Sequence, residues 1–464
     1  MSELSKRQNF FIAKEFSLFL LIAVLAITLI NGLDHGILVT LNTYLLLMLY
    51  RSSKTFAMFL YFIMSITMYV LPVLFHSYID YFSLVEIGFD YNYIHALVYV
   101  FIFNTVFYIS YHFFCKNVFN RPIDIFTKIS VRHAILASLL FMFISLVASH
   151  YYLSYMGKTA GEHGTSTPFT EVATILTYLR VSSVALIGFY IVNHNTKNLI
   201  AFILYFSLLT LSISLALNSG SRFEVVILLI VVGFIHIETI KRHKFSFLLL
   251  LVILTPFIVV LFPVLMAYRN NTLGLVETFI GVLDSSIINN RLTEYSFSFH
   301  LGDIILDRMN LIGVIQRVIE IGSENSIYHF DYLQNITNNI PRVLWEGKSV
   351  AGINGNSLGH EFGILAASDN KTSITLTVIG ESFYQLKYYG IVIAVFQGII
   401  FSFFDKKIAC VTAGAFILYL MLVINIVTIG SYVFVVSKII MIFIVYLLVM
   451  FFTGLLKYRL NFTK

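Results

Sequence analysis

The stretch NLIAFILYFSLLTLSISLAL, residues 198–217, contains no charged side chain. A helix of this length crosses the roughly 30 Å hydrocarbon core of a bilayer. Similar runs recur along the chain, in which hydrophobic residues make up 58%, charged residues only 12%, and the mean hydropathy is +0.87. Soluble domains do not reach such values. The sequence therefore predicts an all-α polytopic integral membrane protein.

Length and charge place about twelve transmembrane helices along the chain. Their predicted cores are 16–33, 36–50, 55–75, 93–114, 133–152, 173–192, 198–217, 223–239, 246–267, 387–404, 408–428 and 431–455. The first run lacks a small-residue cleavage site and continues into the next span, which is typical of a signal-anchor. We therefore expect nine spans in 1–267, a large loop at 268–386 and three spans in 387–464.

Basic residues gather in alternate loops. The clusters lie at 6–14, 51–54, 116–132, 197, 241–244, 406–407 and 457–464. Cytoplasmic loops carry an excess of Lys and Arg, so the pattern places both termini in the cytoplasm and loop 268–386 outside. The net charge of +6 thus reflects topology and does not indicate a nucleic-acid partner. Only Cys115 and Cys410 are present, which argues against a disulfide framework or a thiolate metal site.

The large outer loop contains short predicted elements. Residues 303–320, DIILDRMNLIGVIQRVIE, have the spacing of an amphipathic or lid-like helix. Pro341 then precedes the glycine-rich stretch GKSVAGINGNSLG. No P-loop or dinucleotide fingerprint occurs anywhere in the chain, so the sequence offers no sign of ATP as an energy source.

Arginines on the outer side run against the usual placement of positive charge. The set comprises Arg222, Arg269, Arg291, Arg308, Arg317 and Arg342, with Lys348 beside them and Arg180 roughly 10 Å inside the sixth span. One alternative is that each arginine pairs with a nearby carboxylate or snorkels to the interface, and this is the favoured interpretation for Arg317 beside Glu320. The loop as a whole is acidic, so discrete arginines within it indicate a folded pocket for a compact anion. Pyrophosphate fits, because guanidinium groups bind phosphate oxygens in pairs.

Several segments resemble a known family. They are NSGSR (218–222), PRVLWEGKS (341–349), NSLGHEFGIL (356–365) and SITLTVIGESFYQLKYYG (373–390). In order and spacing they resemble bacterial polysaccharide repeat-unit polymerases of the Wzy type, which usually have proline where this chain has Glu346. The resemblance covers the topology of the whole chain, and residue-level similarity about its second half.

This resemblance implies a metal-independent glycosyltransferase with a GT-C-like fold, working at the periplasmic face of the bacterial inner membrane. Such polymerases join undecaprenyl-pyrophosphate-linked repeat units into O-antigen or capsular-type polysaccharide, and the pyrophosphate bond supplies the driving force without a cofactor. The implied partners are the lipid-linked donor and acceptor, membrane lipid, a chain-length regulator and a flippase. Two alternatives stay open: an O-antigen ligase that uses a lipid A-core acceptor, and a lipid-linked oligosaccharide flippase or transporter.

The implied chemistry needs three kinds of residue. For a clamp on the leaving pyrophosphate we expect Arg222, Arg342, Lys348, Arg269 and Arg291. For the general base we expect Glu381 first, then His360 and Glu361. For sugar contacts we expect Trp345, Asn356 and Tyr384.

Simpler roles are open for some of these residues. Trp345 equally suits an interfacial anchor, and His360 with Glu361 suits a helix cap or ion pair. The histidines at 300, 329 and 360 are far apart and no HExxH-like spacing occurs, so no metal site is predicted.

Overall fold

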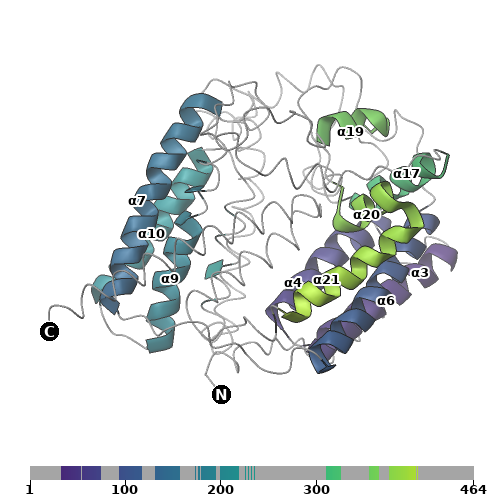
Figure 1. Ribbon diagram of the computed structural model, residues 1–464, viewed down its shortest axis with the longest axis horizontal. Helices are drawn as coiled ribbons and strands as arrows, with labels where there is room; N and C mark the ends of the chain where they lie inside the picture. Colours follow the sequence, from purple (N-terminus) through teal and green to yellow (C-terminus); the bar gives the residue numbers. More distant parts are fainter. Residues whose placement is uncertain are drawn as a thin grey trace.

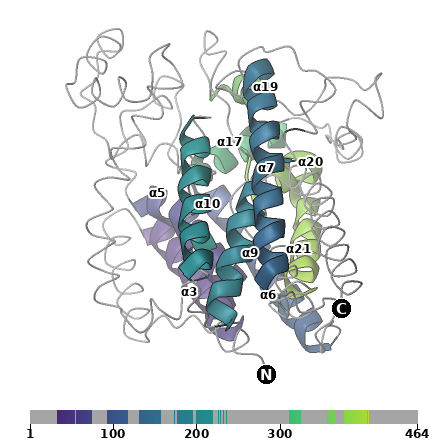
Figure 2. The ribbon, with the colours of Figure 1, turned by 90° about the vertical axis from the view of Figure 1, so that its left-hand side faces the viewer.

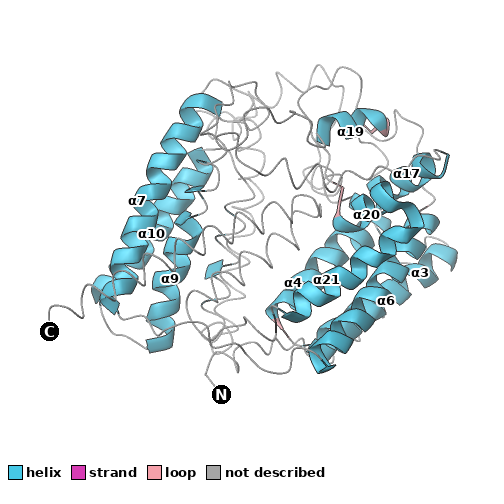
Figure 3. Cartoon of the chain, in the orientation of Figure 1, coloured by secondary structure: helices cyan, strands magenta, loops and turns pink. Residues whose placement is uncertain are grey.

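The computed structural model describes residues 33–53, 55–74, 93–117, 131–156, 173, 176–177, 179–194, 199–218, 225, 228, 231–232, 235, 310–324, 355–364, 376–403 and 405. Every regular element in this part of the chain is helical (Figure 3), which confirms the predicted all-α class there. Among the described residues, four helices are long and apolar enough to cross a membrane: Ile94–Cys115, Ala134–Ser154, Leu199–Leu217 and Val378–Phe403. They match four of the predicted spans. The predicted spans 16–33, 223–239, 246–267, 408–428 and 431–455 lie mostly or wholly outside the described residues.

One group of helices is built around α6 (Ile94–Asn117) and lies on the right in Figure 1. Its other members are α3 (Leu33–Ser53), α4 (Phe56–Ser65), the π-helical turn η1 (Ile66–Val70), α5 (Leu71–Leu74), α17 (Leu311–Glu324), α20 (Val378–Leu386), the 3-10 turn η4 (Lys387–Gly390) and α21 (Ile391–Phe403). Helix α6 packs against α3, α17 and α21, and α17 packs against α20. The short helix α19 (Gly355–Glu361) lies above this group in Figure 1.

A second group consists of α7 (Val131–Met156), α9 (Leu179–His194) and α10 (Leu199–Asn218), which face the viewer in Figure 2. The Ser145 hydroxyl donates to the Thr177 carbonyl oxygen (2.9 Å), and the Ser183 hydroxyl donates to the Ser138 carbonyl oxygen (2.7 Å). The two bonds show that α7 and α9 run in opposite directions. Small hydroxyl residues at such interfaces let membrane helices approach closely and bond to each other.

The outer faces of these helices are apolar. Exposed large side chains follow helical spacing on α7, at Leu136, Leu139, Phe143 and Val147, and on α3, at Ile37, Leu41, Tyr44 and Met48. Stripes of this kind are stable in contact with lipid chains and unfavourable in water. They support the assignment of this chain as a membrane protein.

Helices α6 and α21 run in the same direction. Near the start of α6, the Tyr99 hydroxyl lies 3.0 Å from the Ser382 hydroxyl oxygen, and near its end the Tyr111 hydroxyl donates to Asp405 Oδ2 (2.8 Å). Thr55, at the beginning of the third predicted span, donates to the same oxygen (2.8 Å). The third span therefore begins where α6 ends. The number of spans and their orientation across the membrane stay predictions.

A bend joins α20 to α21. Lys387 takes a positive φ of 52°, and a Cβ added at Gly390 would lie 2.1 Å from the Ser382 carbonyl oxygen. Only glycine fits at position 390, because any side chain would collide with that backbone oxygen. Helix α20, which precedes this bend, begins at Val378. The helical segment therefore starts earlier than the predicted core 387–404 of the tenth span.

The segment predicted as a lid-like helix is buried. Helix α17 begins at Leu311, where Asn310 Oδ1 accepts from the Gly313 N–H (3.1 Å) as a helix cap, and residues 303–309 lie outside the described residues. Ile312, Ile315 and Val318 are completely buried. The amphipathic pattern is therefore real, but its apolar face packs against α6, η1 and α20.

Candidate functional site

The predicted site residues divide by location. Glu381, His360, Glu361 and Tyr384 are described, on α19 and α20. Arg222, Arg269, Arg291, Arg342, Lys348 and Trp345 lie outside the described residues, as does the side chain of Asn356, whose backbone belongs to α19. The pyrophosphate clamp thus stays a prediction, whereas the candidate bases and one sugar contact have positions in the fold.

Helix α19 ends directly after the two candidate residues His360 and Glu361. The Gly363 N–H donates to the His360 carbonyl oxygen (3.0 Å), and the Ile364 N–H donates to the Gly359 carbonyl oxygen (2.8 Å). With Gly363 at φ 61°, these two bonds form a Schellman motif, which needs a left-handed residue just past the helix end. The last turn of α19 is thereby fixed. Within it, Glu361 is exposed and His360 is half-buried.

Helix α20 holds the third candidate base. Thr377 caps the helix, because its hydroxyl oxygen accepts from the Gly380 N–H (3.2 Å) and its carbonyl oxygen accepts from the Glu381 N–H (2.8 Å). Glu381 lies in the first turn, where a negative charge is favourable, and its side chain is only 1% exposed. Ser382, which follows it, contacts Tyr99 of α6. Glu381 is thus part of the packed interface between α20 and its neighbours.

The two helices meet at Tyr384. Its hydroxyl donates to Glu361 Oε2 over a long 3.4 Å, and its ring packs edge-on against Phe362, with the ring centroids 5.5 Å apart. Tyr384 lies one turn after Glu381 on α20, and residues at this spacing are neighbours on a helix surface. The fold therefore brings Glu361 and Tyr384 together from two segments, with Glu381 one turn earlier on α20. We call these three residues, with His360, the α19–α20 cluster.

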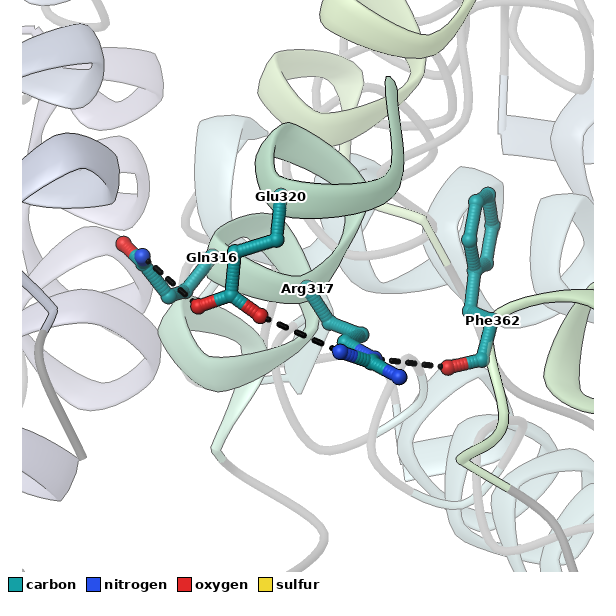
Figure 4. Close-up of polar contacts among 4 residues, drawn as sticks. All are labelled: Gln316, Arg317, Glu320 and Phe362. Atoms are coloured by element: carbon teal, nitrogen blue, oxygen red, sulfur yellow. Dashed lines mark hydrogen bonds and ion pairs between the residues drawn. The ribbon is translucent and has the colours of Figure 1, made fainter. Parts of the chain in front are cut away.

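Helix α17 connects this cluster to α6, and Figure 4 shows the part of this connection that runs from Gln316 to Phe362. The Ala96 N–H donates to Gln316 Oε1 (2.9 Å), and Gln316 Nε2 donates to Glu320 Oε1 (3.0 Å). Arg317 Nη1 lies 3.3 Å from Glu320 Oε2, and Arg317 Nε donates to the Phe362 carbonyl oxygen (3.0 Å). The pairing expected between Arg317 and Glu320 is confirmed. The bond to Phe362 was not expected.

Some polar residues around the cluster were missed from the sequence. Gln316, Ser382 and Gln385 are buried, and Gln316 links two helices. A usable signal was the spacing of Gln316 and Glu320, which lie four residues apart and therefore on one face of a helix. Arg180, predicted inside the sixth span, is 3% exposed at the start of α9 and belongs to the second group of helices.

The cluster can support proton transfer from a hydroxyl group. An exposed carboxylate such as Glu361 can accept a proton from a bound alcohol. The neighbouring Tyr384 hydroxyl can orient this carboxylate through its hydrogen bond. In the described part of the chain, no group of three or more His, Cys, Asp or Glu side chains is arranged to hold a metal ion. Comparison with protein-family models, curated proteins and solved structures finds no match. We therefore infer function from the chemistry of the cluster and from the sequence motifs.

Proposed function

We propose that this protein is a metal-independent glycosyltransferase that polymerises undecaprenyl-pyrophosphate-linked repeat units into O-antigen or capsular-type polysaccharide. In this proposal it has about twelve spans in a GT-C-like arrangement, and it works at the periplasmic face of the bacterial inner membrane. One observation carries the proposal. The segments 356–365 and 373–390, which resemble the polymerase family, meet at Tyr384, where the carboxylate of Glu361 accepts a hydrogen bond.

In the proposed reaction, a hydroxyl oxygen of the acceptor sugar attacks the anomeric carbon of the donor glycan. The bond between that carbon and the pyrophosphate oxygen breaks, and undecaprenyl pyrophosphate leaves with the bonding electrons. The hydroxyl proton passes to a general base. Glu361 suits this role because it is exposed. Glu381 is buried, so it could act as the base only in a conformation that uncovers it.

The remaining parts of the reaction involve residues outside the described part of the chain. Arg222, Arg342 and Lys348, with Arg269 and Arg291, are proposed to hold the pyrophosphate as its charge develops. Each such charge-assisted contact is worth about 1.5–3 kcal/mol, so removing two together should abolish turnover. Trp345, Asn356 and Tyr384 are proposed to orient the sugars, since aromatic and amide groups offer flat apolar faces and hydrogen bonds.

The test uses full-length protein in lipid nanodiscs. The substrate is the lipid-linked repeat unit, extracted from host cells that lack this protein. A ladder of longer lipid-linked glycans is the expected result. Glu361→Gln, which keeps the side-chain volume, should lower the rate of ladder formation by about 100-fold. Asp34→Asn, an exposed carboxylate on α3, is the matched control and should keep the wild-type rate.

Other outcomes would redirect the assignment. Transfer of glycan to added lipid A-core without a ladder would indicate a ligase. Movement of the lipid-linked unit across the membrane with no new glycosidic bond would indicate a transporter. Intact protein with active substrate and none of these products would overturn the proposal.

A further inference from the structure

Helix α17 supplies partners to the ends of two other helices. The first N–H groups and last C=O groups of an α-helix have no partner within that helix. Ala96 lies in the first turn of α6, and its N–H is bound by Gln316. Phe362 directly follows the last residue of α19, and its carbonyl oxygen is bound by Arg317. Two adjacent residues of α17 thus complete the start of α6 and the end of α19.

Glu320 joins these two contacts into one chain. Its Oε1 accepts from Gln316 and its Oε2 pairs with Arg317, so both carboxylate oxygens are engaged (Figure 4). The result is a continuous series of polar contacts from the first turn of α6 to the end of α19. Helix α6 is a candidate membrane span. This series of polar contacts therefore links α19 to the membrane-spanning part of the protein.

We propose that Arg317 is a positioning residue that sets the place of Glu361 and His360 by holding the end of α19 to α17. Its consequence for catalysis rests on the proposed function, but its consequence for the position of α19 does not. Phe362 is one residue from Glu361, and its ring contacts Tyr384. A shift of the Phe362 carbonyl therefore moves the carboxylate relative to its tyrosine partner.

The guanidinium group suits this task for a geometric reason. Arg317 presents Nε to the Phe362 carbonyl oxygen and Nη1 to Glu320 within one rigid plane. A lysine ammonium is a single flexible point charge, so it cannot hold both acceptors in a fixed relation. The Arg317 and Glu320 side chains are 29% and 32% exposed, and an ion pair this close to solvent adds little to global stability. Fixing the geometry of α19 is a better account of the contact than stabilising the whole fold.

Hydrogen–deuterium exchange of the full chain in nanodiscs tests this inference without any substrate. Arg317→Ala should raise exchange at the amides of Phe362, Gly363 and Ile364 by about tenfold or more, while α21 keeps its wild-type protection. Arg317→Lys should give an intermediate increase of about threefold. Arg51→Ala, an exposed arginine at the end of α3, is the matched control and should leave these amides unchanged.

In the polymerisation assay, Arg317→Ala should lower kcat by at least about tenfold while KM for the lipid-linked unit changes less than about twofold. Wild-type exchange at residues 362–364 in both Arg317 variants would overturn the positioning role. If Arg317→Ala does not fold, Arg317→Lys and Glu320→Gln decide the question by the same exchange measurement. A wild-type protein that forms no ladder would refute the proposed function, yet the exchange result would still decide the role of Arg317.

Discussion

The two ends of the parallel pair α6 and α21 carry different polar assemblies. The near end is the one beside α17 and α19, and the far end is the one beside Asp405. At the far end, Asp405 is 6% exposed and one of its oxygens accepts from the hydroxyls of Thr55 and Tyr111, each at 2.8 Å. At the near end, the chain through Gln316, Glu320 and Arg317 is partly exposed, with contacts of 2.9 to 3.3 Å. The Asp405 assembly joins residues of predicted membrane spans to one another. The assembly through Gln316, Glu320 and Arg317 extends from the span α6 to α19.

The difference in burial predicts different roles for the two assemblies. A buried carboxylate with neutral hydroxyl donors contributes through groups that cannot be left unpaired in a low-dielectric interior. A half-exposed ion pair contributes little energy, because water and salt screen it. We therefore expect changes at the Asp405 end to affect unfolding, and changes at the Arg317 end to affect the α19–α20 cluster.

The largest effect on stability is expected from Asp405→Ala. The substitution leaves the Thr55 and Tyr111 hydroxyls buried without this acceptor, which should lower the free energy of unfolding by about 3 kcal/mol or more. The measurement is unfolding by SDS titration in mixed micelles, followed by circular dichroism. Asp405→Asn keeps an acceptor oxygen and should lose less than half as much. Equal losses for both variants would show that the carboxylate charge, and not the hydrogen bonding, matters.

Removing a single donor should have a smaller effect. Tyr111→Phe deletes one hydroxyl and leaves the bond from Thr55 to Asp405 in place, so we expect a loss of about 1–1.5 kcal/mol in the same titration. Thr55→Val should lose more, because the Thr55 hydroxyl oxygen also accepts from the Met58 N–H (3.4 Å) as the cap of α4. Because both donors share one oxygen, the double variant should depart from additivity by about 0.5 kcal/mol or more. Strict additivity would contradict a shared acceptor.

At the near end, Gly363→Ala tests the termination of α19. Alanine at a φ of 61° costs about 1 kcal/mol relative to glycine. Because α19 is short, this cost should appear as faster amide exchange at residues 358–364, with little change in the SDS midpoint. Gly363→Asn is the control, since asparagine tolerates the left-handed conformation. Equal exchange in both variants would argue against the Schellman motif.

The smallest change in global stability is expected for Glu320→Gln. This carboxylate-to-amide change matches Asp405→Asn at the opposite end, but Glu320 is 32% exposed. We expect a loss below about 0.5 kcal/mol in the SDS titration. A loss as large as that of Asp405→Asn would erase the distinction between the two ends.

The membrane spans could be predicted from the sequence because their signal is local. The run 93–114 appears as α6 and the run 133–152 as α7, each extended by a few residues. Helix α19 itself was not predicted, because residues 355–359 belong to the glycine-rich stretch, although Gly363, two residues after Glu361, is a local signal for its end.

The polar contacts between elements could not be predicted in the same way. Asp405 precedes the predicted basic cluster 406–407 and the sequence indicates no role for it, because its partners Thr55 and Tyr111 come from distant parts of the chain. Likewise, the sequence placed Glu381 in the loop just before the tenth predicted span, and its burial could not be predicted from that segment alone. Patterns in one segment carry no information about which distant segment covers it.

The contact between Thr55 and Asp405 has a consequence for biosynthesis. The two residues are 350 positions apart. At about 5–20 residues per second, the ribosome needs roughly 20–70 seconds to travel between them. Throughout that interval for Thr55, and over the 294 residues that separate Tyr111 from Asp405, the carboxylate that accepts from both hydroxyls has not been synthesised. We therefore expect a chain truncated before residue 405 to hold these earlier spans together less stably than the full chain.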